Sequence, residues 1–323
     1  MSLKIAVLGP GGVGGLVAAA LARSGVDVVV VARAATAQAL GETGLSVRSA
    51  MLGDFTAHPR AVPLLTDRVD ALLVATKATA LMASLQRVAA PPGLVVPLLN
   101  GVEHVAVLRR RFGEPCVAAG VIRVESDRPR IGEIVQPSPG CRIDLASGRP
   151  ALAPALAALA QTLQTAGITA RIGDSEADVM WSKLARLCAL ALTTSAADRP
   201  LGFVRSDPRW RSALDNAVTE TVRVAVAEGA RLHAAQTLTE LESAHADLGS
   251  SMQRDIAAGR EPELDAIAGA VLRAGARHAI RCPTVGWLTE RVAARAGIPA
   301  PAASPTVMRP RHPPDLAHHD AQT

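Results

Sequence analysis

The stretch Lys4-Ile-Ala-Val-Leu-Gly-Pro-Gly-Gly-Val-Gly-Gly-Leu-Val-Ala-Ala-Ala-Leu-Ala22 decides the fold. A continuous apolar run, a glycine-rich segment and an alanine- and leucine-rich segment predict a buried strand, a turn and a helix. The spacing Gly9-x-Gly11-x-x-Gly14 is that of a dinucleotide-binding loop. There the first glycine permits the tight turn, the second admits a pyrophosphate, and the third lets the helix pack on the strand.

The phosphates of such a ligand would lie against the N–H groups at the start of the helix. The predicted phosphate-binding residues are therefore Gly9, Pro10, Gly11, Gly12, Val13 and Gly14. The alternative is a glycine-rich loop that binds nothing. A second strand over 26–32 follows the helix, and this continuation favours the binding loop.

The end of the second strand indicates which dinucleotide fits. An NAD site usually has Asp or Glu there to hold the ribose 2′-hydroxyl. No acidic residue occurs from Val28 to Gly41, and the strand ends in Ala32-Arg33. A guanidinium fork matches a dianionic 2′-phosphate. The sequence therefore predicts NADP(H), held by Arg33, and the alternative is that Arg33 is a solvated loop cation.

Composition limits the classes of protein and partner. A chain of 323 residues with 49% hydrophobic residues predicts two domains with a large core. The net charge of +5 suits an anionic ligand, but scattered arginines and 2% aromatic residues argue against nucleic acid. No apolar run is long enough for a membrane span. Four scattered cysteines and a strand that begins at residue 4 predict a cytoplasmic protein without a leader.

Strands alternate with helices in the first half of the chain, which predicts a parallel, doubly wound sheet of the Rossmann type. Three later strands, over 117–124, 132–136 and 141–145, are expected to be antiparallel additions to that sheet. The other expected elements are strands over 60–65, 70–76, 93–99 and 168–172, and helices over 80–89, 102–111 and 151–166.

The pattern becomes helical at Ser175-x-x-Asp178, which is similar to a capping box. Further helices are expected over 209–230, 237–246, 250–259, 261–279 and 285–296. The predicted domains are thus an NADP-binding domain over 1–174, an all-α substrate domain over 175–297 and a disordered tail over 298–323. A solvated tail explains His312, His318 and His319 better than a metal site does, so no metal is predicted.

Two polar residues follow strands of the predicted sheet, where ligands of open α/β sheets bind. Lys77 is a candidate for a cofactor phosphate or the adenine edge, and the alternative is an exposed loop cation. Asn100 is a candidate for hydrogen bonds to the nicotinamide or the substrate. The alternative for Asn100 is a helix cap ahead of Val102.

The helical half holds three further candidates. Lys183 lies on the margin of an apolar helix face, where partial desolvation would lower the pKa of its ammonium and make it a proton donor. Spacing alone favours a lysine whose stem covers apolar surface. Ser251 opens a short helix and either meets a carboxylate or caps the helix. Glu263, after Pro262, either orients Lys183 or is an ordinary first-turn glutamate.

These stretches resemble the ketopantoate reductase (2-dehydropantoate 2-reductase) family, over Lys4 to about Ala294. The most specific are Ser250-Ser-Met-Gln-Arg-Asp255 and Glu263-Leu-Asp265; the others are Lys4–Gly15, Arg33, Val74-Ala-Thr-Lys77, Leu98-Leu-Asn-Gly101 and Trp181-Ser-Lys-Leu184. The resemblance implies that NADPH delivers a hydride to C2 of a 2-oxo acid to give the 2-hydroxy acid, as in pantothenate biosynthesis.

The resemblance also implies residue roles, with the site in a cleft between the two domains. Lys183 would be the general acid and Glu263 would lie beside it. Ser251 would meet the substrate carboxylate, and Asn100 would lie near nicotinamide and substrate. Arg33 and Lys77 would serve the NADP end of the cofactor. A homodimer is compatible with this assignment.

The sequence departs from the family at three positions. Leu187 and Ala191 stand where the family usually has asparagines one and two turns after the lysine, and Leu201 replaces a later polar residue. Each lost hydrogen bond is worth about 1 kcal/mol, which favours a more apolar 2-oxo acid than ketopantoate. The same departure motivates two rivals, a non-catalytic NADP(H) sensor and a dehydrogenase for another hydroxy or amino acid.

Overall fold

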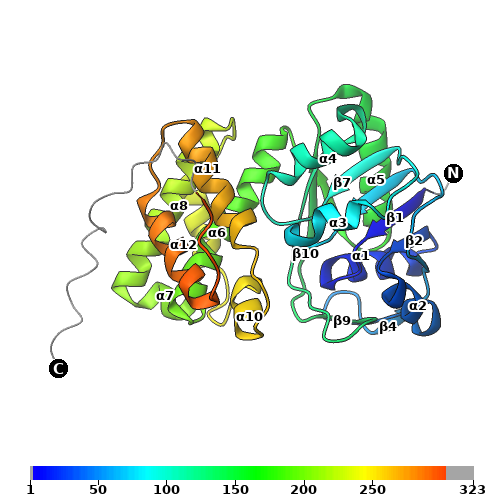
Figure 1. Ribbon diagram of the computed structural model, residues 1–323, viewed down its shortest axis with the longest axis horizontal. Helices are drawn as coiled ribbons and strands as arrows, with labels where there is room; N and C mark the ends of the chain where they lie inside the picture. Colours follow the sequence, from blue (N-terminus) through cyan, green and yellow to red (C-terminus); the bar gives the residue numbers. More distant parts are fainter. Residues whose placement is uncertain (1–2, 303–323) are drawn as a thin grey trace. The chain divides into compact units, whose positions relative to one another are not determined.

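The computed structural model describes residues 3–302 (Figure 1). The chain divides into two compact units after Met180. The helix α6 (Glu176–Ala197) contains this point of division. Most of the predicted tail, including His312, His318 and His319, lies outside the described residues.

A five-stranded parallel sheet is the centre of the first unit. Its spatial order is β5-β2-β1-β6-β7, and β1 pairs with β2 on one side and with β6 on the other. The predicted parallel sheet is confirmed. Its strands are β1 (Lys4–Leu8), β2 (Asp27–Val31), β5 (Arg60–Val62), β6 (Ala71–Val74) and β7 (Leu94–Pro97).

Both faces of this sheet are buried, because alternate residues of each strand contribute to different clusters of the core. Ile5 and Val7 belong to a cluster that contains apolar residues of the helices α1 (Gly12–Arg23) and α5 (Ala153–Thr165). Ala6 and Leu8 belong to a second cluster, with residues of α3 (Leu81–Leu85) and α4 (His104–Phe112). Helices on both faces confirm the doubly wound fold.

The later strands do not extend the five-stranded sheet as predicted. In one three-stranded sheet, β10 (Cys141–Ala146) pairs antiparallel with β8 (Ala119–Val124) and parallel with β11 (Thr169–Ile172). In another, β9 (Glu133–Gln136) pairs parallel with β3 (Leu45–Ser49). The prediction of antiparallel additions was therefore right only for the β8–β10 pair.

The reason for this error is a strand that the sequence analysis did not assign. In β3, Leu45, Val47 and Ser49 are buried, while Ser46 and Arg48 are exposed. This alternation gives β9 a half-buried partner strand. The remaining elements of this unit are α2 (Ala34–Thr43), β4 (Phe55–Ala57) and the 3₁₀ turns η1 (Ala78–Ala80), η2 (Glu114–Cys116) and η3 (Pro150–Leu152).

The second unit is helical, as predicted. After α6 its elements are α7 (Leu201–Ser206), α8 (Pro208–Ala227), α9 (Ala234–Glu242), α10 (Ser251–Ala257), the π-helix η4 (Asp265–Gly269), α11 (Ala270–Arg277) and α12 (Pro283–Ala296). No helix within residues 3–302 combines the length and the hydropathy that a membrane span requires.

Side chains of α8 join this helix to α12. The buried Glu220 carboxylate accepts the N–H groups of Thr284 and Val285 at 2.9 Å, and thereby satisfies the first turn of α12. Burial raises the pKa of Glu220, against the effect of these hydrogen bonds. The ring centroids of Trp210 and Trp287 are 6.1 Å apart.

Candidate active site

The turn after β1 has a compact geometry. The N–H of Gly9 donates to the carbonyl of Val31 in β2, and the N–H of Gly11 donates to the carbonyl of Gly9 at 2.9 Å. Gly9 has a φ of +93°, which an L side chain rarely adopts. The α1 helix starts at Gly12 with Gly11 as its N-cap residue. The chain between β1 and α1 is thus a tight turn. The N–H groups that follow it belong to the N-terminus of α1.

The three motif glycines meet different requirements. A Cβ atom on Gly14 would lie 2.2 Å from the carbonyl oxygen of Gly9, so this glycine permits the helix to approach the turn. A Cβ on Gly9 would lie 2.8 Å from Cγ2 of Thr76. A Cβ on Gly11 would have no atom of the protein within 4 Å, and the backbone there is ordinary extended chain. Neither conformation nor packing requires a glycine at position 11.

Polar residues follow four neighbouring strands at one edge of the sheet. Along the order β2-β1-β6-β7 they are Arg33, the glycine turn, Thr76-Lys77 and Asn100. All these strands are parallel, so their carboxyl ends lie at the same edge. Three strand spacings, about 14 Å, separate β2 from β7. This edge therefore offers a linear series of polar groups, with the glycine turn near its middle.

Arg33 lies two residues after the end of β2 and is the N-cap residue of α2, where its carbonyl accepts the N–H of Ala37 at 2.8 Å. Its side chain is exposed and makes no ion pair or hydrogen bond with another residue in the range 3–302. Lys77 is also exposed and precedes η1. Both cations thus lie at the sheet edge where the sequence analysis expected them.

Asn100 is half-buried and is followed by Gly101, whose φ is +90°. The N-cap residue of the next helix, α4, is Glu103, so Asn100 is not that cap. The alternative interpretation of Asn100 as a helix cap is wrong. A half-buried amide at the carboxyl end of β7 remains suited to hydrogen bonds with a ligand at this edge.

Two residues near the turn were not singled out by the sequence analysis. The Thr76 hydroxyl oxygen is buried and has no hydrogen-bond partner among the described residues. The Ser126 hydroxyl donates to the carbonyl of Gly12 at 2.9 Å and joins the loop after β8 to the turn. Thr76 is the last residue of the strand predicted over 70–76, whereas the observed β6 ends at Val74. No local signal marked Ser126, because 114 residues separate it from Gly12.

These observations fit a dinucleotide. The open space at Gly11 would admit a pyrophosphate, which a larger side chain at this position would exclude. The N-terminus of α1 provides N–H donors for it. The buried Thr76 hydroxyl lacks a protein partner at the same edge. Arg33 provides a cation at the end of β2, where a 2′-phosphate would require one. The turn, Arg33, Lys77 and Asn100 are the residues of this unit that would hold the cofactor.

The second unit carries Lys183 on α6. The Ser175 hydroxyl accepts the N–H of Asp178 at 3.0 Å, so the predicted serine start of this helix is confirmed. Lys183 and Leu187 are half-buried, one turn apart, while Ala191, a further turn on, is fully buried. The two residues that follow Lys183 at one-turn intervals on α6 are therefore both apolar and at least half-buried. Leu201, the third departure from the family pattern, is also fully buried, at the start of α7.

The two serines at the start of α10 have different environments. Ser250 is the N-cap residue, is buried, and accepts the N–H of Gln253 at 3.1 Å. Its hydroxyl also hydrogen-bonds to that of Thr194 in α6, at 3.1 Å. Ser251 is exposed, and its side chain makes no hydrogen bond within the described part of the chain. The capping function belongs to Ser250, which leaves the hydroxyl of Ser251 accessible to a ligand.

Glu263 is 9% exposed and lies immediately before the helical residues that begin at Leu264. Its carbonyl accepts the N–H of Ile267 at 3.1 Å. The sequence predicts Glu263 inside the first turn of a helix, after Pro262 at the first helical position. Compared with the predicted range 261–279, the helix begins three residues later, at Leu264, and Glu263 occupies the N-cap position.

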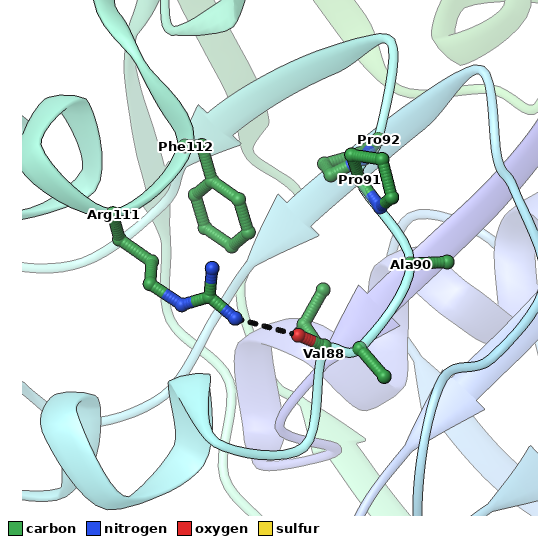
Figure 2. Close-up of a pocket in the computed structure, with 7 residues that line it drawn as sticks. Val88, Ala90, Pro91, Pro92, Arg111 and Phe112 are labelled. Carbon is green, nitrogen blue, oxygen red and sulfur yellow. Dashed lines mark hydrogen bonds between the residues drawn. The ribbon is translucent and has the colours of Figure 1, made fainter.

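A small hollow elsewhere in the first unit is not part of this site. It has a volume of about 120 Å³ and is lined by the loop 88–92 with Arg111 and Phe112 (Figure 2). Arg111 donates to the carbonyl of Val88 at 2.9 Å. The loop precedes β7, so it lies at the amino-terminal edge of the parallel sheet. Ligands of open α/β sheets bind at the opposite edge.

Two family models match most of the chain. A family model described as "Ketopantoate reductase PanE/ApbA" matches residues 5–145, and one described as "Ketopantoate reductase PanE/ApbA C terminal" matches residues 177–296. The chain belongs to the ketopantoate reductase family. The first match contains the glycine turn, Arg33, Lys77 and Asn100, and the second contains Lys183, Ser251 and Glu263.

Individual members of the ketopantoate reductase family are similar over nearly the whole chain. The 2-dehydropantoate 2-reductase of Caulobacter vibrioides is 32% identical, over 87% of this chain and 94% of its own length. The crystal structure of 2-dehydropantoate 2-reductase from Geobacter metallireducens has a TM-score of 0.83 at 26% identity, over 90% of this chain and 99% of that one.

The fold of the ketopantoate reductase family also serves other substrates. A ternary structure of D-mandelate dehydrogenase with NADH and anilino(oxo)acetate has a TM-score of 0.84 at 23% identity, over 91% of this chain and 98% of that one. At that identity the likeness concerns the fold alone. Membership makes this chain an oxidoreductase of the ketopantoate reductase family, and its cofactor and substrate have to be inferred from its own residues.

Proposed function

We propose that this protein reduces a 2-oxo acid to the 2-hydroxy acid with NADPH. The observation that carries the proposal is the presence, in a member of this family, of both a half-buried Lys183 and a buried Glu263. A protein that only bound the cofactor would need neither a proton donor nor a carboxylate to orient it. The exposed Ser251 and the amide of Asn100 complete the proposed substrate contacts.

The proposed chemistry uses one proton and one hydride. NADPH supplies the hydride to C2 of the 2-oxo acid. The Lys183 ammonium donates a proton to the ketone oxygen, stabilises the negative charge that develops there, and is reprotonated from solvent. Glu263 orients the ammonium, and Ser251 hydrogen-bonds to the substrate carboxylate. Asn100 hydrogen-bonds near the nicotinamide and the substrate.

The preference for NADPH is proposed from Arg33 and from the absence of an acid at the end of β2. Arg33 is exposed and has no ion-pair partner within residues 3–302, so no carboxylate competes with a 2′-phosphate for its guanidinium. Lys77, the second cation at this edge, is proposed to contact a cofactor phosphate. Together they favour the more negatively charged of the two nicotinamide dinucleotides.

Replacing Arg33 with alanine tests this preference. We expect the Kd for NADPH to rise about 10- to 100-fold, because a charge-assisted bidentate contact contributes roughly 1.5–3 kcal/mol. The Kd for NADH should hardly change, and NADH binding by the same variant is therefore the internal control. Titration of both cofactors by calorimetry measures the effect. An equal loss for the two cofactors would contradict the assignment of Arg33 to the 2′-phosphate.

The substrate is proposed to be more apolar than ketopantoate. Leu187, Ala191 and Leu201 provide no hydrogen-bond donor or acceptor in their side chains. A site that hydrogen-bonds substrate hydroxyls discriminates strongly against analogues without them, whereas an apolar site prefers alkyl or aryl groups. The same three residues also favour the second candidate function, a sensor that binds NADP(H) without turnover.

Oxidation of NADPH by a panel of 2-oxo acids separates these functions. The panel contains ketopantoate, 2-oxoisovalerate, 2-oxo-4-methylpentanoate and phenylglyoxylate, each followed by the loss of NADPH absorbance. We expect the unhydroxylated acids to give the higher kcat/KM. NADPH binding without oxidation by any of the four acids would favour the sensor. Faster reduction of ketopantoate would contradict the proposed substrate preference only.

A further inference from the structure

The segment after Glu263 departs from the continuous α-helix that the sequence predicts. Residues 265–269 form the π-helix η4, in which the N–H of Ala270 donates to the carbonyl of Asp265, five residues earlier. Such π turns are short insertions into α-helices and frequently occur at functional sites. One inserted residue rotates the preceding chain by about 100° relative to the following helix. The direction of Glu263 relative to α11 therefore depends on this π turn.

Arg273, one helix turn after the last residue of the π turn, hydrogen-bonds to the first residue of that turn, Asp265. The Arg273 Nη1 donates to Oδ1 of Asp265 at 2.6 Å, and Nη2 donates to Oδ2 at 3.2 Å. The same Nη2 donates to the backbone carbonyl of Asp265 at 3.2 Å. The Arg273 guanidinium thus binds both the side chain and the backbone of Asp265. These contacts use the planar fork of donors that an arginine has and a lysine lacks.

Gly269 provides the space through which this ion pair passes. A Cβ atom there would lie 2.5 Å from Oδ1 of Asp265 and 2.9 Å from Nη1 of Arg273. The φ of Gly269 is −57°, so its backbone does not require a glycine. A buried glycine in the interior of a helix costs about 1 kcal/mol relative to alanine. The ion pair leaves no room for a larger residue here, and Cβ of Pro301, 3.0 Å from the added atom, also limits the space.

We infer that Asp265, Gly269 and Arg273 form a clamp that fixes the π turn and thereby sets the direction of the Glu263 carboxylate. These three are positioning residues, and the inference rests on the proposed function of Glu263. If the clamp opens, the segment can relax to a regular α-helix. The carboxylate then turns away from the direction in which it would orient Lys183.

Replacement of Arg273 by methionine tests the clamp, with Arg277→Met as the matched control. Arg277 lies one turn later on α11 and forms an exposed ion pair with Glu228 at 2.9 Å. We expect Arg273→Met to lower kcat about 10- to 100-fold, as misplacement of a group by about 1 Å does in other enzymes. The Kd for NADPH should stay unchanged, Arg277→Met should behave as the parent, and Arg273→Lys should restore only part of the rate.

A double-mutant cycle with Glu263→Gln separates positioning from general damage. If Arg273 acts through Glu263, Arg273→Met should cause little further loss of kcat in the Glu263→Gln background. Additive losses, or equal losses in Arg273→Met and Arg277→Met, would overturn the inference. If Glu263→Gln alone keeps the full rate, the proposed function of Glu263 fails instead.

Amide hydrogen exchange tests the clamp without any substrate. In the full-length protein, Arg273→Met should accelerate exchange in a peptide that covers residues 265–270, and Arg277→Met should not. Gly269→Ala should have the same effect, because its Cβ forces the ion pair apart. Unchanged exchange in both clamp variants would overturn the inference, whatever the activity of the protein.

Discussion

Lys183→Ala should lose most of its turnover and still bind NADPH. General acid catalysis contributes about 10²–10⁴ to the rate, and the charge of an ammonium near a developing alkoxide adds electrostatic stabilisation. Lys183 lies on α6 in the second unit, whereas the proposed cofactor residues belong to the first unit. We therefore expect kcat to fall at least about 100-fold with the 2-oxo acid and the Kd for NADPH to remain unchanged.

The matched control for Lys183 is Arg186→Ala on the same helix. Arg186 is also half-buried, and it forms an ion pair with Glu240 at 3.8 Å. A general effect of removing a cation from α6 would lower kcat equally in both variants. Steady-state rates and cofactor titrations of the two proteins make the comparison. Near-normal turnover of Lys183→Ala would exclude this residue as the acid.

Gly11→Ala should abolish tight cofactor binding without lowering the stability of the protein. The added methyl group meets no protein atom within 4 Å and sits on ordinary extended backbone, so unfolding should be unchanged. It would occupy the space through which a pyrophosphate approaches the helix N-terminus. We expect the Kd for NADPH to rise at least about 100-fold, which corresponds to the roughly 2.7 kcal/mol of a few lost phosphate contacts.

Two other glycines make this experiment specific. Gly41 in α2 also has open space for a Cβ, so Gly41→Ala should leave cofactor binding unchanged and should raise stability by up to about 1 kcal/mol, because alanine is the better helix former. Gly14→Ala should destabilise the fold itself, because its Cβ would lie 2.2 Å from the Gly9 carbonyl oxygen. Thermal unfolding and calorimetric titration of the three variants separate these cases. Normal NADPH affinity in Gly11→Ala would show that the turn does not hold the pyrophosphate.

The central sheet could be predicted because its signals are local. A glycine turn between an apolar strand and an apolar helix gives the direction of the chain and the position of the ligand edge. The pairing of β3 with β9 could not be predicted, because the paired residues Ser46 and Glu133 are far apart in the sequence. Each of the two strands is short, and nothing in either sequence specifies the other.

The candidate site was predicted in composition but not in detail. Positions after strands pointed to Arg33, Lys77 and Asn100, whereas Lys183 was chosen through the family resemblance, because spacing alone favoured a lysine whose stem covers apolar surface. The choice of Ser250 over Ser251 as the cap depends on Thr194, a tertiary contact that sequence spacing does not show. The π turn after Glu263 was also missed. Its cause is an ion pair across Gly269, and the hydrophobic pattern of the segment is that of an ordinary α-helix.

All tryptophans of this chain belong to the second unit, so the two units differ in intrinsic fluorescence. The three tryptophans occur at positions 181, 210 and 287, and the sequence contains no tyrosine. Ultraviolet-excited emission therefore originates only in the second unit, where the guanidinium of Arg291 lies 5.3 Å from the ring centroid of Trp287. A melting curve followed by tryptophan fluorescence would report mainly on the second unit, whereas circular dichroism records the helices of both units. Together, the two spectra would resolve separate unfolding events without any added dye.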